Sequence, residues 1–178
     1  MARQAAWRLR PASMGDIDGL HALAARPLVF RYLFDGAPPV RDFIARRVAQ
    51  SIANASEPGF GLWLLENHAG GCAGGVELRP YPASRPAELT YLLAPDYWGH
   101  GLAVRMAWTV IAGAFRSSAV DTVVAGADQP NAASFAVMRR LGMRFHKDVE
   151  YPLGAGAEYV LQRDDAGPMP RPALLPLG

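Results

Sequence analysis

The sequence predicts a single domain of the mixed α/β (α+β) class, and two observations carry that prediction. Hydrophobic residues make up 51% of the 178-residue chain and charged residues 19%, which is typical of a compact core. The residue patterns predict one strand, two helices and three antiparallel strands, after which helices and strands alternate. A chain of this length buries enough surface to fold without a disulfide or a structural metal. We therefore expect one domain over residues 1–163.

The first strand and the two helices come from the beginning of the chain. Residues 6–10 alternate apolar and basic side chains, as in a strand with one face in water. Ser13 and Asp16 resemble a capping box for the helix that follows, and Pro27 is expected to end that helix. The apolar stripe of residues 40–52 predicts a second helix.

The remaining elements follow from similar patterns. Strands are predicted at residues 60–65, 72–78 and 88–93, with a bulge at Gly74–Gly75 of the first hairpin. The later elements are a helix from Gly101, a strand at 120–125, a helix at 132–141, and closing strands at 143–149 and 158–161. Residues 164–178 hold four prolines and are expected to form an irregular tail.

Composition excludes several classes of protein. The net charge of +2 argues against a binder of the nucleic-acid backbone. No apolar run reaches the roughly 18 residues that a membrane span needs, and the first ten residues lack the apolar core of a signal peptide. Cys72 is the single cysteine, and with four scattered histidines it excludes a disulfide framework and a zinc cluster. We expect a cytoplasmic protein in which Cys72 is not a nucleophile.

The most informative segment is residues 92–104, where a strand ends at Ala94 and a helix starts after a short turn. Gly99, Gly101 and Ala103 carry little or no side chain, so successive backbone N–H groups can surround an anion. The helix N-terminus adds roughly half a positive charge. This arrangement suits a pyrophosphate, although the glycine spacing taken alone favours a helix start that binds no ligand.

Two other phosphate-binding motifs fit this segment poorly. A dinucleotide fingerprint requires a third glycine where Val104 stands. Asp121 begins its predicted strand, whereas the ribose-binding acid of that motif follows the end of a strand. The Lys-Ser/Thr pair of a nucleotide P-loop is absent.

A second segment, the predicted helix after Gln129, carries an unusual polar position. Asn131 stands where a helix N-cap is expected. Ser134 lies on the same face as Val137, Met138 and Leu141, which are most simply core residues. A hydroxyl on an apolar stripe needs a hydrogen-bond partner once it is buried, and the preceding turn offers one.

Together these segments resemble the GNAT superfamily of acyl-CoA-dependent N-acyltransferases, in particular its branch of ribosomal-protein N-terminal acetyltransferases. The family's cofactor loop, Gln/Arg-x-x-Gly-x-Gly/Ala, is matched by residues 98–103 with Trp98 at the first position. The Asn-x-x-Ser of the later helix is matched by Asn131 and Ser134, and its Leu-Gly-hydrophobe ending by residues 141–143. The resemblance extends over residues 8–163.

The resemblance implies a mixed, mostly antiparallel central sheet that is splayed mid-way and flanked by helices, with acetyl-CoA as cosubstrate in the gap and no metal. Main-chain groups of the strand that ends at Ala94 would pair with the pantetheine arm, as an added strand would. The cofactor-binding residues it implies are Leu92, Leu93, Ala94, Trp98, Gly99, His100, Gly101, Leu102, Ala103, Val104, Asn131 and Ser134.

The resemblance also implies catalytic roles. Acyl transfer to an amine needs a base for the amine, donors for the carbonyl oxygen and a proton for the thiolate. A backbone N–H near Leu93 would serve the carbonyl oxygen. Met138 stands where much of the superfamily has a proton-donating tyrosine, so Ser134, or a bound water, would take that role. Glu88 and Glu150 are the candidate bases, with Glu88 preferred.

The acyl acceptor is expected to be either an amine-bearing small molecule or a protein N-terminus. Neither a nucleic acid nor a membrane is expected as a partner, and a homodimer is possible. Tyr32, Phe34 and Tyr151 would supply aromatic walls, and Asp35 or Glu150 would attract a cationic amine.

Two alternative functions remain at this stage. The absence of a tyrosine at Met138 favours a CoA-binding regulatory module without turnover. A nucleotide-dependent enzyme is disfavoured by the missing lysine and third glycine described above.

Overall fold

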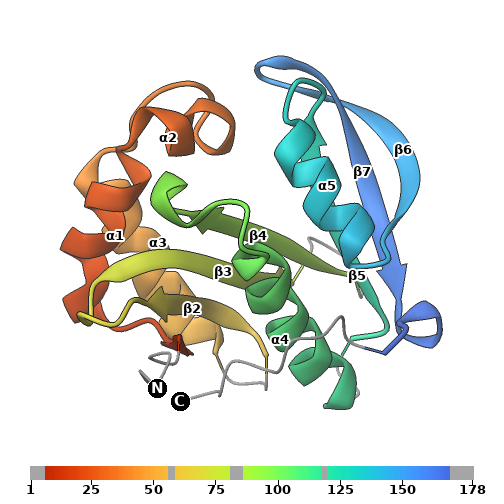
Figure 1. Ribbon diagram of the computed structural model, residues 1–178, viewed down its shortest axis with the longest axis horizontal. Coiled ribbons are helices and arrows are strands. Elements are labelled where there is room, and N and C mark those ends of the chain that lie inside the picture. The colour runs from red at the N-terminus through yellow and green to blue at the C-terminus, as the bar shows by residue number, and fades with distance from the viewer. Residues whose placement is uncertain (1–6, 56–58, 81–85, 118–119, 169–178) are drawn as a thin grey trace, which may run out of the picture.

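The described part of the chain forms a seven-stranded sheet with helices on both faces (Figure 1). The computed structural model describes residues 7–55, 59–80, 86–117 and 120–168. Its strands are β1 (Arg8–Pro11), β2 (Gly61–Glu66), β3 (Cys72–Pro80), β4 (Ala87–Leu93), β5 (Thr122–Asp128), β6 (Arg144–Tyr151) and β7 (Gly154–Gln162). Its α-helices are α1 (Ile17–Ala24), α2 (Pro27–Leu33), α3 (Arg41–Asn54), α4 (Leu102–Arg116) and α5 (Ala132–Arg140). Short 3-10 turns are η1 (Met14–Asp16), η2 (Pro95–Tyr97) and η3 (Arg163–Asp165).

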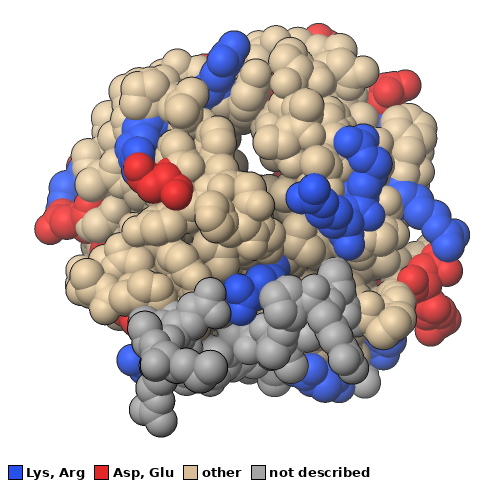
Figure 2. Space-filling model, in the orientation of Figure 1, with Lys and Arg blue, Asp and Glu red and all other residues tan. Residues whose placement is uncertain are grey.

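The sheet is mixed and mostly antiparallel, as predicted, with the strand order β1-β2-β3-β4-β5-β7-β6. Among the strands of the described residues, only β4 and β5 run parallel, and they pair at Ala87 with Val123 and at Glu88 with Val124. From Leu89 onward the two strands separate. Figure 1 shows α2 on one side of this split and α5 on the other. In the same orientation, Figure 2 shows an opening that passes through the molecule between these two helices.

Both faces of the sheet are buried at β2. Leu64 packs in a cluster with side chains of α1 and α3, whereas the next residue, Leu65, belongs to the larger core that includes α4. This alternation follows from the two-residue period of a strand. Helices α1 and α3 therefore cover one face of the sheet at β2 and helix α4 covers the other, and the split between β4 and β5 stays accessible.

One helix was missed and the bounds predicted for the closing strands were wrong, although the first helix, α1, ends at Ala24, before Pro27, as predicted. Pro27 occupies the first turn of an additional helix, α2, because its missing N–H and fixed φ suit that position. The closing strands are longer than predicted, because β6 lies at the sheet edge and is exposed at nearly every position. An edge strand without a buried face has no clear apolar alternation. The predicted irregular tail overlaps η3, and residues 169–178 lie outside the described residues.

The bulge expected at Gly74–Gly75 lies next to that pair. Leu65 pairs with Gly74 and Glu66 pairs with Cys72, so Ala73 is the additional residue on β3. None of the helices in the described part of the chain has the length and apolar character needed to cross a bilayer.

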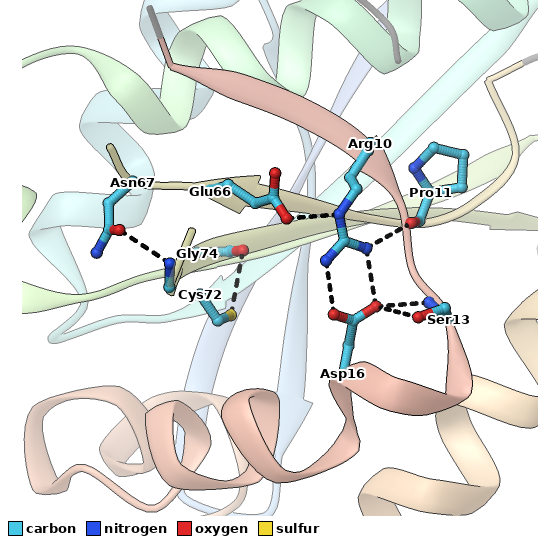
Figure 3. Close-up of polar contacts among 9 residues, drawn as sticks. Arg10, Pro11, Ser13, Asp16, Glu66, Asn67, Cys72 and Gly74 are labelled. Atoms are coloured by element: carbon cyan, nitrogen blue, oxygen red, sulfur yellow. Dashed lines mark hydrogen bonds and ion pairs between the residues drawn. The ribbon is translucent and has the colours of Figure 1, made fainter. Parts of the chain in front are cut away.

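Arg10 links β1 to β2 and to the η1 turn through ion pairs (Figure 3). Arg10 on β1 donates to Glu66 on β2 at 2.6 Å and to both carboxylate oxygens of Asp16 at 2.6 and 2.8 Å. Asp16 also accepts the backbone N–H of Ser13 at 2.7 Å, which is the bond expected of the capping box. The Arg10 guanidinium and the Ser13 donors hold the pKa of Asp16 well below its usual range.

We expect Arg10→Ala to lower the free energy of unfolding by about 2 kcal/mol at pH 7, because it leaves two half-buried carboxylates without their cation. The pKa of Asp16 is lower in the folded state than in the unfolded state, so its stabilisation is present above about pH 4 and is lost as the pH falls. The difference between wild type and variant should therefore shrink below pH 4.

Urea unfolding at pH 7 and at pH 3 measures this difference. Arg41→Ala, which removes the exposed ion pair with Asp18, is the control and should leave stability unchanged. A deficit of the same size at both pH values would contradict the role of Asp16.

Candidate active site

A cleft of about 820 Å³ occupies the split between β4 and β5. One wall comes from α1, α2 and the loop after α2, and the other comes from α5. At the rim, a Cβ placed on Gly36 would lie 3.6 Å from Leu153 Cδ2, so the α2–α3 loop meets the β6–β7 turn. This contact closes the split above the sheet, which is why Figure 2 shows an opening with material on all sides.

The start of α4 forms an open cradle of backbone amides at one end of the cleft. Gly99 and Gly101 have φ angles of +80° and +71°, and a Cβ on either would meet nothing within 4 Å. Gly101 is the N-cap, and the first helical bond runs from Arg105 N–H to its carbonyl at 3.1 Å. The N–H groups of residues 102–104 therefore have no acceptor within the helix and face a site suited to an anion.

Trp98 holds this loop against the end of β4. Its indole Nε1 donates to the carbonyl of Leu93 at 2.8 Å, and the ring remains 44% exposed. His100 accepts or donates a local bond to the Trp98 carbonyl at 2.8 Å, is exposed, and does not line the cleft. Of the loop residues expected to contact a cofactor, the structure therefore brings all but His100 to the cleft.

The edge of β4 that faces the split offers main-chain groups. The N–H of Ala94 bonds the carbonyl of Ala73 on β3 at 2.8 Å. Because successive strand residues direct their N–H and C=O groups to alternate edges, those of Tyr91 and the N–H of Leu93 face the split, whereas the Leu93 carbonyl already accepts the Trp98 indole N–H. Beyond Glu88, β5 does not pair with them. An extended ligand can pair with this edge; Ala94 itself lies outside the cleft lining.

The helix α5 forms the opposite wall. The Asn131 side chain caps it by accepting the Ser134 N–H at 3.2 Å. The Tyr91 hydroxyl donates to the Ser134 carbonyl at 3.1 Å and so links β4 to α5 across the split. Burial raises the pKa of Tyr91 to about 12, which keeps this hydroxyl protonated. Ser134 lines the cleft, whereas Met138 is fully buried behind it.

The structure separates the two glutamates proposed as bases. Glu88 lines the cleft and forms an ion pair with Arg79, whose Nε and Nη2 lie 2.8 and 2.7 Å from Oε2. Glu150 is exposed on the edge strand β6 and does not line the cleft. A second ion pair in the cleft joins Arg47 to Glu77.

The aromatic residues expected at the acceptor end, Tyr32, Phe34 and Tyr151, all line the cleft. Tyr32 carries the guanidinium of Arg31 over its ring at 5.2 Å. Phe34 packs edge-to-face on Phe43 with ring centroids 6.0 Å apart.

Sequence reasoning missed Asp128, the last residue of β5. Its side chain lines the cleft and is 7% exposed, and within the described residues its Oδ1 has no hydrogen-bond partner. Burial, together with the charge of Asp35, raises the pKa of its carboxyl. The signal available in the sequence was an acid at a strand end, three residues before the helix cap Asn131.

Cys72 lies at the start of β3, where its thiol donates a weak bond to the Gly74 carbonyl at 3.8 Å (Figure 3). Burial raises its pKa to about 11. Since only the thiolate attacks electrophiles, Cys72→Ala should keep wild-type turnover, and iodoacetamide should modify the native protein slowly at pH 7.5. Modification should accelerate as the pH rises toward 11. Rapid labelling at pH 7.5 together with loss of activity would contradict this prediction.

Comparison with known proteins agrees with this geometry. Residues 7–144 match the Acetyltransferase (GNAT) domain family. The protein therefore belongs to the GNAT acetyltransferase family and is an acyltransferase. Membership implies acetyl-CoA-dependent acetylation.

Solved structures share the fold at low sequence identity. One is a putative acetyltransferase from Salmonella typhimurium with acetyl-CoA, at 16% identity and a TM-score of 0.74, with 91% of this chain and 96% of that chain covered. A ribosomal L7/L12 alpha-N-protein acetyltransferase with coenzyme A has 17% identity and a TM-score of 0.74, covering 91% and 97%. The aminoglycoside acetyltransferase AAC(6')-Ib with ribostamycin and coenzyme A has 15% identity and a TM-score of 0.75, covering 90% and 95%.

Proposed function

We propose that the protein transfers the acetyl group of acetyl-CoA to a primary amine by direct attack within a ternary complex. The observation that carries the proposal is the open amide cradle at the start of α4, next to an unpaired edge of β4. A diphosphate at Leu102–Val104 and a pantetheine arm along Leu93 would use these groups together. The cleft volume of about 820 Å³ leaves room for an acceptor beside the thioester.

In this mechanism the enzyme's own groups position the reaction. The Leu93 N–H, which faces the split, would stabilise the developing charge on the carbonyl oxygen. Ser134, or a water that it holds, would supply a proton to the departing thiolate. Glu88 is engaged by Arg79 and so acts more readily as part of an ion pair than as a base. Asn131 would contact the arm of the donor while it caps α5.

Two kinds of acceptor are supported by similarity. The resemblance to the ribosomal N-terminal branch favours a protein N-terminus, and the likeness to the aminoglycoside acetyltransferase AAC(6')-Ib favours an aminoglycoside-type amine. Release of free thiol from acetyl-CoA, measured over a panel of amines, tests the proposal. Binding of coenzyme A without thiol release on any amine would support a regulatory CoA-binding module instead.

A further inference from the structure

Asp128 has a position that folding alone does not explain. Only 7% of the Asp128 surface is exposed, although the residue lines the cleft. Its Oδ1 accepts no hydrogen bond from the described residues. An unpaired buried carboxylate is costly, and proteins retain such groups mainly where a ligand completes them. Within the described residues, one oxygen of this buried carboxylate is therefore left without a partner.

An aromatic ring lies beside this carboxylate. Tyr151 extends from the end of β6 across two glycines: a Cβ on Gly156 would be 2.5 Å from its Cδ2, and a Cβ on Gly126 would be 1.9 Å from its hydroxyl oxygen. Gly126 and Asp128 are two residues apart on β5 and share one face of the strand. Gly156 pairs directly with Asp128. A carboxylate next to an aromatic face is a site for an ammonium group.

A second carboxylate faces Asp128 from the opposite wall. Asp35, in the loop after α2, lines the same cleft, and its charge acts on the carboxyl of Asp128. Among the described residues, the arginines that line the cleft are Arg31, Arg47, Arg79 and Arg140. Two of them are engaged by Glu77 and Glu88, Arg31 stacks on Tyr32, and Arg140 lies at the far end of α5.

We propose, building on the function proposed above, that Asp128 binds the ammonium group of the acceptor and takes up its proton, and that Asp35 binds a second ammonium group of the same molecule. The acceptor is therefore a small organic diamine or polyamine-type cation. Tyr32 and Tyr151 provide the apolar walls for the carbon chain between the two nitrogens.

The acceptor ammonium group carries three protons, and each has a destination in this step. The Asp128 carboxylate removes one proton from the acceptor ammonium, and the neutral nitrogen forms a bond to the acetyl carbon. The carbon–sulfur bond breaks, and a second nitrogen proton passes through Ser134, or a water that it holds, to the thiolate to give free coenzyme A. The third proton stays on the amide, and Asp128 returns its proton to water.

The test compares 1,4-diaminobutane with butylamine, which has the same chain and one ammonium group. Wild-type kcat/KM should be at least tenfold higher for the diamine, and Asp35→Asn should abolish this preference. Asp128→Asn should lower kcat/KM for both amines at least 100-fold while the Kd for coenzyme A changes less than twofold. Asp148→Asn, the same change at an exposed carboxylate outside the cleft lining, is the matched control and should behave as wild type.

Equal use of the two amines by the wild-type protein, or wild-type kcat/KM in folded Asp128→Asn, would overturn the inference. The amine preference is measured on the wild-type protein and so does not depend on the folding of any variant. If the wild-type protein binds coenzyme A but releases thiol with no amine at all, the proposed function itself fails.

Discussion

Gly59→Ala should destabilise the protein by about 3 kcal/mol or more, the largest effect expected of a single methyl group in this fold. Gly59 lies against α4 with a φ angle of +88°, and a Cβ there would be 2.6 Å from the Ala114 nitrogen and 2.7 Å from the Val110 oxygen. Both obstacles are backbone atoms of a helix, so no side chain can move to accept the methyl group. The left-handed φ adds its own cost for alanine.

Gly113→Ala is the matched control for this prediction. Gly113 is on α4 and faces Gly59 from the other side, but its Cβ would lie 3.5 Å from the Gly59 Cα, an ordinary contact. Alanine is favoured over glycine inside a helix by about 0.5–1 kcal/mol. Thermal and urea unfolding should therefore show a large loss of stability for Gly59→Ala and none for Gly113→Ala. Similar stability of both variants would show that Gly59 and α4 pack less closely than described.

Ala103→Glu should separate folding from cofactor binding, and its effect on binding is the largest we expect. Ala103 is the second residue of α4 and lines the cleft. A glutamate in the first turn of a helix is compatible with the helix dipole, so stability should be equal or slightly higher. The same carboxylate would stand where the diphosphate of coenzyme A is proposed to bind. The Kd for coenzyme A should rise about 100-fold, or ~2.7 kcal/mol.

Ala103→Gln has nearly the same shape without the charge and should weaken binding far less. The difference between the two variants should shrink in 0.5 M NaCl, because salt screens exposed charges. Calorimetric titration with coenzyme A measures both. Equal affinity of the two variants at low salt would place the diphosphate elsewhere and remove the main support for the cofactor site.

The parts of the fold that sequence could predict are those with a strong periodic or capping signal. The start of α4 after Gly101 and the capping of α5 by Asn131 depend on local chemistry, and both are confirmed. The split between β4 and β5 was expected only through family resemblance, since no local pattern specifies where two parallel strands separate. The additional helix α2 was missed because a proline at the first helical position also serves as a stop signal.

The acceptor end of the site was the least predictable part. Asp128, Tyr151 and Asp35 come from three segments that are brought together only by the sheet order and the closing turn. Gly126 and Gly156 leave the space that the Tyr151 ring occupies, and this packing is known only from the structure. Long-range packing of this kind leaves no spacing rule in the sequence.

The opening through the molecule has a kinetic consequence. The acetyl donor would enter at the start of α4, where its diphosphate binds, and the amine would enter near the β6–β7 turn. Neither ligand would then obstruct the other. Association in random order follows, without a compulsory first ligand. Product inhibition by the acetylated amine should then be competitive against the amine and mixed against the acetyl donor.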